Sequence, residues 1–134
     1  MTRRAYHVRS PAPTAGLSAG AIALLLTGCA SFAPPRTATA DPAVVTALNG
    51  LVRGPCNQAV ASVMAGEGIP ISEVRAAIYS EIRGGPSSTV SQYDVWLYPR
   101  DQDGAVIVNL DNTCRPMQIY ARGGANLQRA ERRS

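Results

Sequence analysis

The sequence contains no lysine, a single histidine, His7, and no acidic residue before Asp41. It also lacks a long hydrophobic run, because its compact apolar stretch, residues 16–26, covers only eleven positions. A helix needs about 20 apolar residues to cross a bilayer, so this stretch does not predict a permanent transmembrane anchor. Its length, and the three arginines among the first nine residues, are typical of a cleaved secretory signal.

The run Leu26-Thr27-Gly28-Cys29 directly follows the apolar stretch and resembles the processing motif of bacterial lipoprotein precursors. The resemblance implies that residues 1–28 are removed as a signal peptide and that Cys29 receives diacylglycerol and palmitate-type lipid. One acyl chain binds a membrane weakly, and stable anchoring takes two or more, which a lipid cysteine of that family carries. Ordinary secretion, with Cys29 as an odd cysteine, is the alternative.

The same resemblance implies where the protein works. In that family an aspartate directly after the lipid cysteine retains the protein at the inner membrane, whereas Ala30 and Ser31 stand here. We therefore expect a cell-envelope protein, anchored through Cys29 to the outer membrane and facing the periplasm. Residues 29–41 are rich in Pro, Ala and Thr and predict a tether, of which residues 31–40 would span about 30 Å if extended.

Removal of the signal segment also changes the charge. Ten arginines then remain against nine acidic residues, a net charge of ten minus nine, or +1, compared with +4 for the whole chain. A nucleic-acid reader needs a basic face, so no nucleic-acid partner is expected. Residues 123–134 hold several arginines and predict a flexible basic tail. Contact of that tail with anionic lipid head groups or an acidic partner is the alternative.

Two cysteines remain after cleavage, Cys56 and Cys114. An exported protein folds in an oxidising compartment, where two cysteines allow one intramolecular pairing. We predict a Cys56–Cys114 disulfide, which would stabilise the fold by roughly 4 kcal/mol in the chain-entropy model. A reactive or metal-binding pair is the alternative. The sequence has no C-x-x-C spacing and no histidine outside the signal segment, so no zinc site is expected.

Residues 42–122 predict a small α+β domain whose first part is helical. Asp41 can cap a helix that has Pro42 at its first position, and apolar residues follow at helical spacing. Residues 56–65 repeat this pattern and predict a second helix.

A third helix is expected after Ser72, which can cap it. Val74, Ile78 and Ile82 then recur every four residues, and Gly84-Gly85-Pro86 would end the helix. The domain is therefore expected to begin with two or three short helices.

The pattern changes after Pro86 to short segments bounded by turn residues. Residues 92–98 alternate, 105–110 form a β-branched run, and 114–121 predict a third strand. We expect a three-stranded antiparallel β-meander, because tight turns join the segments. Pro116 has no amide hydrogen and favours a sheet edge. The helices should cover one face of the sheet.

The sequence offers no catalytic arrangement. Ser-His-Asp and Cys-His sites are excluded once His7 is cleaved off, and neither a G-x-x-x-x-G-K loop nor a G-x-G-x-x-G fingerprint occurs. Of the possible carboxylate pairs, Asp101, Asp103 and Asp111 stand in or beside expected turns, where Asp bonds locally. Asp94 lies in an expected strand. The stretch Asp-Gln-Asp-Gly lacks the rest of a calcium loop. We therefore expect that the protein is not an enzyme and that it has neither a metal site nor a cofactor.

One aromatic group is a candidate binding surface. Trp96 and Tyr98 alternate with aliphatic residues in an expected strand and should share one sheet face. Exposed Trp and Tyr make good anchors for a partner protein or glycan, and Arg100 and Arg115 could flank them. The alternative is a half-covered face that binds nothing.

These features predict a non-enzymatic envelope lipoprotein that acts as an interaction or structural module for an envelope protein. A periplasmic inhibitor or ligand-binding lipoprotein, which blocks an enzyme or holds a wall component, is the alternative. The order of helices followed by three strands also resembles the small lipoprotein subunit of the outer-membrane β-barrel assembly machine, in order and size only. That resemblance implies an accessory role in such a complex.

Overall fold

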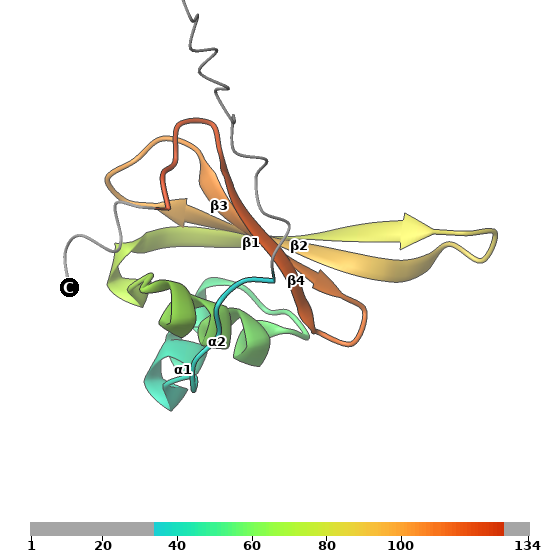
Figure 1. Cartoon of the computed structure of the whole chain (residues 1–134), viewed down its shortest axis with the longest axis horizontal. Coiled ribbons are helices and arrows are strands. Elements are labelled where there is room, and N and C mark those ends of the chain that lie inside the picture. The colour runs from blue at the N-terminus through green and yellow to red at the C-terminus, as the bar shows by residue number, and fades with distance from the viewer. Residues whose placement is uncertain (1–33, 128–134) are drawn as a thin grey trace, which may run out of the picture. The chain divides into compact units, whose positions relative to one another are not determined.

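The computed structural model describes residues 34–127. Cys29, the expected signal segment and residues 128–134 of the expected tail lie outside these residues. The described chain forms one antiparallel sheet, in the order β1-β2-β3-β4, with the helices gathered on one side of it (Figure 1). Its elements are α1 (Pro42–Leu51), α2 (Asn57–Glu67), the 3₁₀ turn η1 (Ile71–Glu73), β1 (Val74–Gly84), β2 (Thr89–Pro99), β3 (Ala105–Asp111) and β4 (Pro116–Arg122).

The first two predicted helices are confirmed, and local chemistry explains their ends. Asp41 caps α1, since its Oδ1 accepts a hydrogen bond from the Ala43 amide at 2.8 Å, and Pro42 occupies the first helical position. The α2 helix ends at Gly68, whose φ of 67° lies in the left-handed region that glycine enters without strain. The α+β class is therefore confirmed for the described chain.

The third predicted helix is wrong, and so is the prediction of three strands. Residues 74–84 form β1, which pairs with β2 along its length, so the described sheet has four strands. Ser72 lies in η1 and caps no α-helix. A spacing of four fits two periods of a strand as well as one turn of a helix, and β-branched Val74, Ile78 and Ile82 pack well on a pleated sheet.

The other expected strands correspond to β2, β3 and β4, and the two expected turns join them. Pro116 opens β4, which is an edge strand, as its missing amide hydrogen predicted. The β2 strand begins at Thr89, earlier than expected, because it pairs with β1 beyond the end of β3.

The hydrophobic core lies between the helices and the inner face of the sheet. Leu48 of α1 and Val60 of α2 are completely buried. Both belong to one hydrophobic cluster, in which residues of the two helices pack against inward-facing residues of β2 and β3. The most deeply buried sheet members are Val95, Leu97, Val108 and Leu110, all at most 1% exposed. Burial of one such side chain contributes roughly 1.5–3 kcal/mol to stability.

The predicted Cys56–Cys114 disulfide is confirmed, with its sulfur atoms 2.05 Å apart. Cys56 stands at the start of α2, and Cys114 lies in the turn before β4. The bond therefore ties the helical layer to the β4 edge of the sheet across 58 positions of sequence.

A part-buried polar cluster around Asn57 joins the helices to β1. The Tyr79 hydroxyl donates to Asn57 Oδ1 at 2.7 Å, and Asn57 Nδ2 donates to Asn49 Oδ1 and to the Val52 carbonyl at 2.7 and 2.8 Å. Asn57 is only 3% exposed, so these bonds satisfy an amide that has lost contact with water. Burial raises the pKa of Tyr79 to about 12, and its hydroxyl stays protonated at neutral pH.

Residues 34–40, expected to end a free tether, lie against α2. The Arg36 amide donates to Glu67 Oε1 at 2.7 Å, and its guanidinium pairs with Glu67 Oε2 at 3.0 Å. The Ala38 amide donates to an α2 carbonyl at 3.0 Å. Gly66 permits this approach, because a Cβ there would overlap the Arg36 backbone. The folded domain therefore includes this segment and does not begin at residue 42.

The first part of the expected tail also belongs to the folded domain. Ala125 and Leu127 pack against the core, and the Asn126 amide donates to Gln102 Oε1 at 2.8 Å. The domain thus extends past residue 122 to at least Leu127.

Candidate interaction surface

The sheet face opposite the helices, called the outer face below, carries rows of side chains that run across the strands. The register places Ile78 opposite Trp96, Trp96 opposite Ile107, and Ile107 opposite Tyr120. Side chains directly opposite one another in antiparallel strands share a face, with Cβ atoms about 4.5–5.5 Å apart. These four residues form an apolar row that crosses all four strands, over roughly 15 Å.

The apolar row is covered unevenly. Ile107 is 0% exposed, although it is not part of the core between sheet and helices. Its neighbours in the row, Trp96 and Tyr120, are half-buried. Ile78 at the sheet edge is 51% exposed. Single exposed apolar residues are ordinary, but contiguous apolar patches are typical of binding surfaces, and this row is at least partly exposed at Ile78, Trp96 and Tyr120.

A polar row runs beside the apolar row, two residues along each strand. It consists of Ser80, Asp94, Asn109 and Gln118, which stand opposite one another in the register. Asn109 Nδ2 donates to Asp94 Oδ1 at 2.7 Å. Burial raises the pKa of Tyr120, and the nearby Asp94 charge adds to the shift. The outer face therefore presents aromatic rings next to planar hydrogen-bonding groups.

Two arginines lie over aromatic rings near the end of the sheet where β2 ends. The Arg75 Cζ is 5.8 Å from the centre of the Tyr98 ring, and the Arg122 Cζ is 5.7 Å from that of Tyr120. Both distances fall within the cation–π range of about 6 Å. The Pro99 carbonyl also accepts a hydrogen bond from Arg75 Nε at 2.9 Å, which holds this guanidinium in place. Neither arginine was predicted to lie on this surface, because each contact depends on tertiary placement.

The four predicted surface residues do not gather at one place. Trp96 and Tyr98 are half-buried and alternate with buried aliphatic residues, as predicted. Arg100 lies in the turn after β2, where its Nε donates to a carbonyl of η1 at 2.9 Å. Arg115 lies in the turn before β4, at the other end of β3, with its Nε 3.0 Å from Asp111 Oδ2. The two arginines therefore do not form one basic patch.

Asp111 organises the turn between β3 and β4. Its Oδ1 accepts hydrogen bonds from the Thr113 hydroxyl at 2.7 Å and from the Thr113 and Arg115 amides at 2.9 Å. These bonds, the Thr113 hydroxyl first among them, lower the pKa of Asp111 to about 2. The predicted role of this aspartate in local turn bonding is confirmed.

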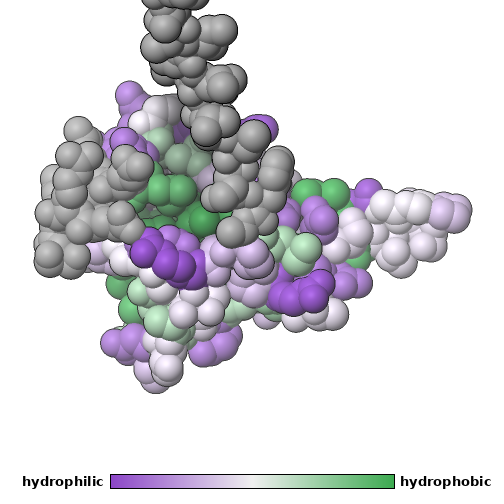
Figure 2. All heavy atoms as spheres, viewed as in Figure 1, coloured by the Kyte–Doolittle hydropathy of each residue, from purple (hydrophilic) through white to green (hydrophobic). Residues whose placement is uncertain are grey.

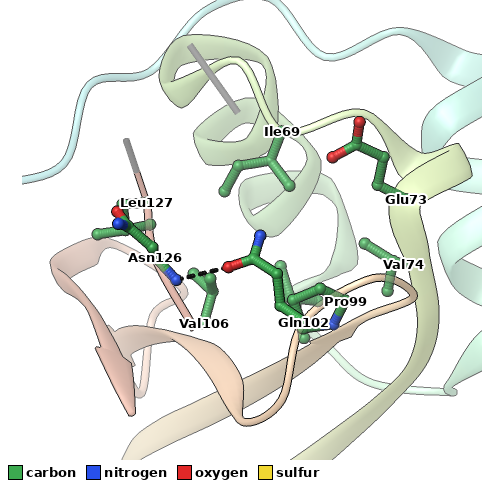
Figure 3. A pocket seen from close by; sticks show the side chains of 9 residues that line it. Ile69, Glu73, Val74, Pro99, Gln102, Val106, Asn126 and Leu127 are labelled. Carbon is green, nitrogen blue, oxygen red and sulfur yellow. Dashed lines mark hydrogen bonds between the residues drawn. The ribbon is translucent and has the colours of Figure 1, made fainter. Parts of the chain in front are cut away.

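A small recess opens at the end of the core where β1 begins and β2 ends. Figure 2 shows hydrophobic side chains at the surface on that side of the molecule. In Figure 3, Gln102 and Ile69 point toward one another across the recess, and Gln102 Oε1 meets the Asn126 amide. The volume of the recess is about 30 Å³, whereas small-molecule sites usually measure about 300–1,000 Å³. The recess therefore does not fit a ligand of that size.

Among residues 34–127, no three His, Cys, Asp or Glu side chains lie close enough together to hold a metal ion. No helix in this part of the chain has the length and apolar character needed to cross a membrane. Comparison with known proteins finds no match, whether among family models, curated protein sequences or solved structures. A function must therefore be argued from the chain's own residues, of which the outer face is the most informative group.

Proposed function

We propose that this protein is a lipid-anchored lipoprotein of the cell envelope that binds a partner protein through its outer face and catalyses no reaction. The observation that carries the proposal is the apolar row, which crosses all four strands on the face opposite the helices. Protein interfaces are typically built around buried aromatic residues, with Trp, Tyr and Arg enriched at their centres. Trp96 and Tyr120, with Arg122 over the latter ring, have this composition.

The docked N-terminal segment supports a partner close to the membrane. Cys29 precedes Pro34 by five positions, and five residues reach at most about 18 Å when fully extended. A free tether over residues 31–40 would allow about 30 Å. Because residues 34–40 lie against α2, an anchor at Cys29 would hold the domain nearer the bilayer. A partner embedded in or bound to the same membrane is then within reach of the outer face.

The anchor is tested by Cys29→Ala in cells that express the full chain. We expect the variant to leave the membrane fraction or to keep its signal segment, because no lipid can be attached. The measurements are fractionation and mass spectrometry of the mature N-terminus. A variant that is processed normally and still sediments with membranes would show that the lipid anchor is not Cys29.

The surface is tested with Trp96→Ala and Ile78→Asp, in a pull-down from envelope solubilised in detergent. Truncation of a central anchor and a charge in the apolar row should each weaken capture of the partner by roughly tenfold or more. The matched control is Leu51→Ala, which changes an apolar residue of α1 that is 37% exposed. Capture that falls equally in all three variants, or in none, would argue against the outer face.

A second candidate function is a ligand-binding lipoprotein that holds a fragment of the cell wall. The polar row favours it, because Asp94, Asn109 and Gln118 offer hydrogen-bonding groups beside Trp96, as a glycan would require. Trp96 is the chain's one tryptophan, so its fluorescence reports directly on this surface. Quenching or enhancement by soluble wall fragments, with no protein captured in the pull-down, would favour the ligand. Capture of the outer-membrane barrel-assembly complex would favour the accessory role.

A further inference from the structure

The hairpin of β1 and β2 extends beyond the rest of the sheet. The β3 strand pairs with β2 only from Gln92 onward, whereas β1 and β2 stay paired out to Gly84 and Thr89. Every residue from Ser80 to Thr89 is exposed. Figure 1 shows this arm reaching to the right, away from α1 and α2. A two-stranded ribbon is marginally stable alone, so an arm of this kind gains from a further strand.

The outer edge of β1 offers a place for that strand. The β1 strand lies at the edge of the described sheet, and an edge strand presents a row of unpaired backbone groups that can template another chain. Proteins often protect such edges with proline or with charged side chains, above all lysine; neither proline nor lysine occurs between Ser80 and Gly84, and the two charged residues there, Glu81 and Arg83, are of opposite sign. Ile82, which is 38% exposed, lies at the centre of this stretch.

The charges on the arm are complementary to those of a second copy. Glu81 and Arg83 flank Ile82 and form an ion pair with one another within the chain. When β1 pairs antiparallel with its own copy about a two-fold axis at Ile82, Glu81 of each chain stands opposite Arg83 of the other. Ser80 then stands opposite Gly84, and the two Ile82 side chains meet. Opposite charges placed in this way stabilise strand pairing.

Neighbouring registers are less favourable. An axis at Glu81 or at Arg83 would set two like charges directly opposite one another, which destabilises a strand pair. The antiparallel arrangement also points the two folded bodies away from each other, because the axis lies near the end of β1 that is remote from the helices. The bodies therefore do not obstruct the pairing.

We propose that the arm is a homodimerisation element, and that a second copy of this chain adds its β1 strand antiparallel to the edge at Ser80–Gly84. The inference is independent of the proposed partner-binding face, since it uses the strand edge and not the apolar row. Confinement of an anchored chain to a membrane would raise the effective concentration of copies. Two joined copies would also hold the membrane through two anchors.

The test uses charge exchange in the full chain, expressed in one cell with two different C-terminal tags. Wild-type copies should co-purify. Glu81→Arg alone places Arg opposite Arg, and Arg83→Glu alone places Glu opposite Glu. For each variant expressed alone, the amount of the second tagged copy that co-purifies should fall roughly tenfold. When the two variants are expressed together, every cross-chain pair is again of opposite sign, and co-purification should return.

The mixed expression separates pairing between chains from the ion pair within one chain, because mixing does not restore the latter. Failure of wild-type copies to co-purify would overturn the proposal, as would single variants that behave like wild type or a mixture that stays separate. Ile82→Cys is a second measurement. It should give a disulfide-linked dimer in an oxidising envelope, whereas Ile78→Cys, which is more exposed at 51%, should not.

Discussion

At the scale of single residues, Tyr79 joins the sheet to the helical layer. Its ring lies against Gly54, where a Cβ would overlap it, and meets the Tyr93 ring edge-on, with centroids 6.1 Å apart. Its hydroxyl donates to the amide oxygen of buried Asn57. A buried polar group that loses its partner costs more than the bond contributes when made. The Tyr79 hydroxyl therefore stabilises the contact between β1 and the helical layer.

We predict that Tyr79→Phe lowers the free energy of unfolding by about 1–2 kcal/mol, because Asn57 Oδ1 then lacks its donor. The measurement is the urea midpoint at constant slope. Tyr98→Phe removes a hydroxyl from a ring outside the core cluster and serves as control, with an expected change within about 0.5 kcal/mol. Equal losses in both variants would mean that the Asn57 bond contributes nothing specific.

At the scale of elements, the segment 34–40 behaves as part of the helical layer although it has no regular structure. Its approach to α2 depends on the absence of a side chain at Gly66 and on the bonds of Arg36 to Glu67. The ion pair is exposed on the Arg36 side and contributes little by itself. The close backbone contact is therefore the more sensitive part of this docking.

We predict that Gly66→Ala destabilises the protein by about 1–2 kcal/mol, because the new Cβ must push residues 34–40 off α2. Gly50→Ala is the matched control: nothing lies within 4 Å of a Cβ there, and the change should stabilise α1 by roughly 0.5–1 kcal/mol. Hydrogen exchange at the Ala38 amide should also rise in the Gly66 variant alone. Unchanged protection there would show that the segment docks without help from Gly66.

A helix was expected where β1 lies because the apolar spacing in this element is ambiguous. The apolar residues Val74, Ile78 and Ile82 satisfy both periods, and local sequence does not choose between them. The choice depends on β2, which pairs with β1 from Val74 to Gly84 and satisfies the backbone groups on that side of the strand. The β-branched residues and the Gly-Gly-Pro turn were the available signals for a hairpin. They predict it only weakly, because strand propensity depends on context.

At the scale of the whole molecule, the disulfide links the two layers. It joins the start of α2 to the turn before β4, across 58 positions, and so restricts the unfolded chain over more than half of the described residues. A small domain has a thin margin of stability from its core alone. The crosslink is therefore expected to contribute a large share of the net stability.

We predict that Cys56→Ala combined with Cys114→Ala lowers the free energy of unfolding by roughly 4 kcal/mol, the chain-entropy value for a loop of this size. Thermal unfolding measures the loss. In the wild-type protein, thiol labelling under denaturing conditions should find both cysteines blocked, whereas reduction should expose them. Labelling of both without a reductant would contradict the disulfide.

The sequence alone determined those features that depend on residues adjacent in the chain or on a small number of possible pairings. Asp41 and Pro42 define a helix start through contacts within three residues, and the alternation around Trp96 separates two sheet faces. The disulfide was predictable because only Cys56 and Cys114 could pair outside Cys29. Each of these features depends on local sequence or has only one possible arrangement.

The tertiary structure alone decided the identity of β1, the docking of residues 34–40 and the composition of the outer face. Ile78, Trp96, Ile107 and Tyr120 form a row only in one register. Irregular pairing in β1 and β4 helps to set that register, and a slip of one residue would send each side chain to the other face. Such alignment arises from contacts between segments that are distant in sequence, so no local pattern specifies it.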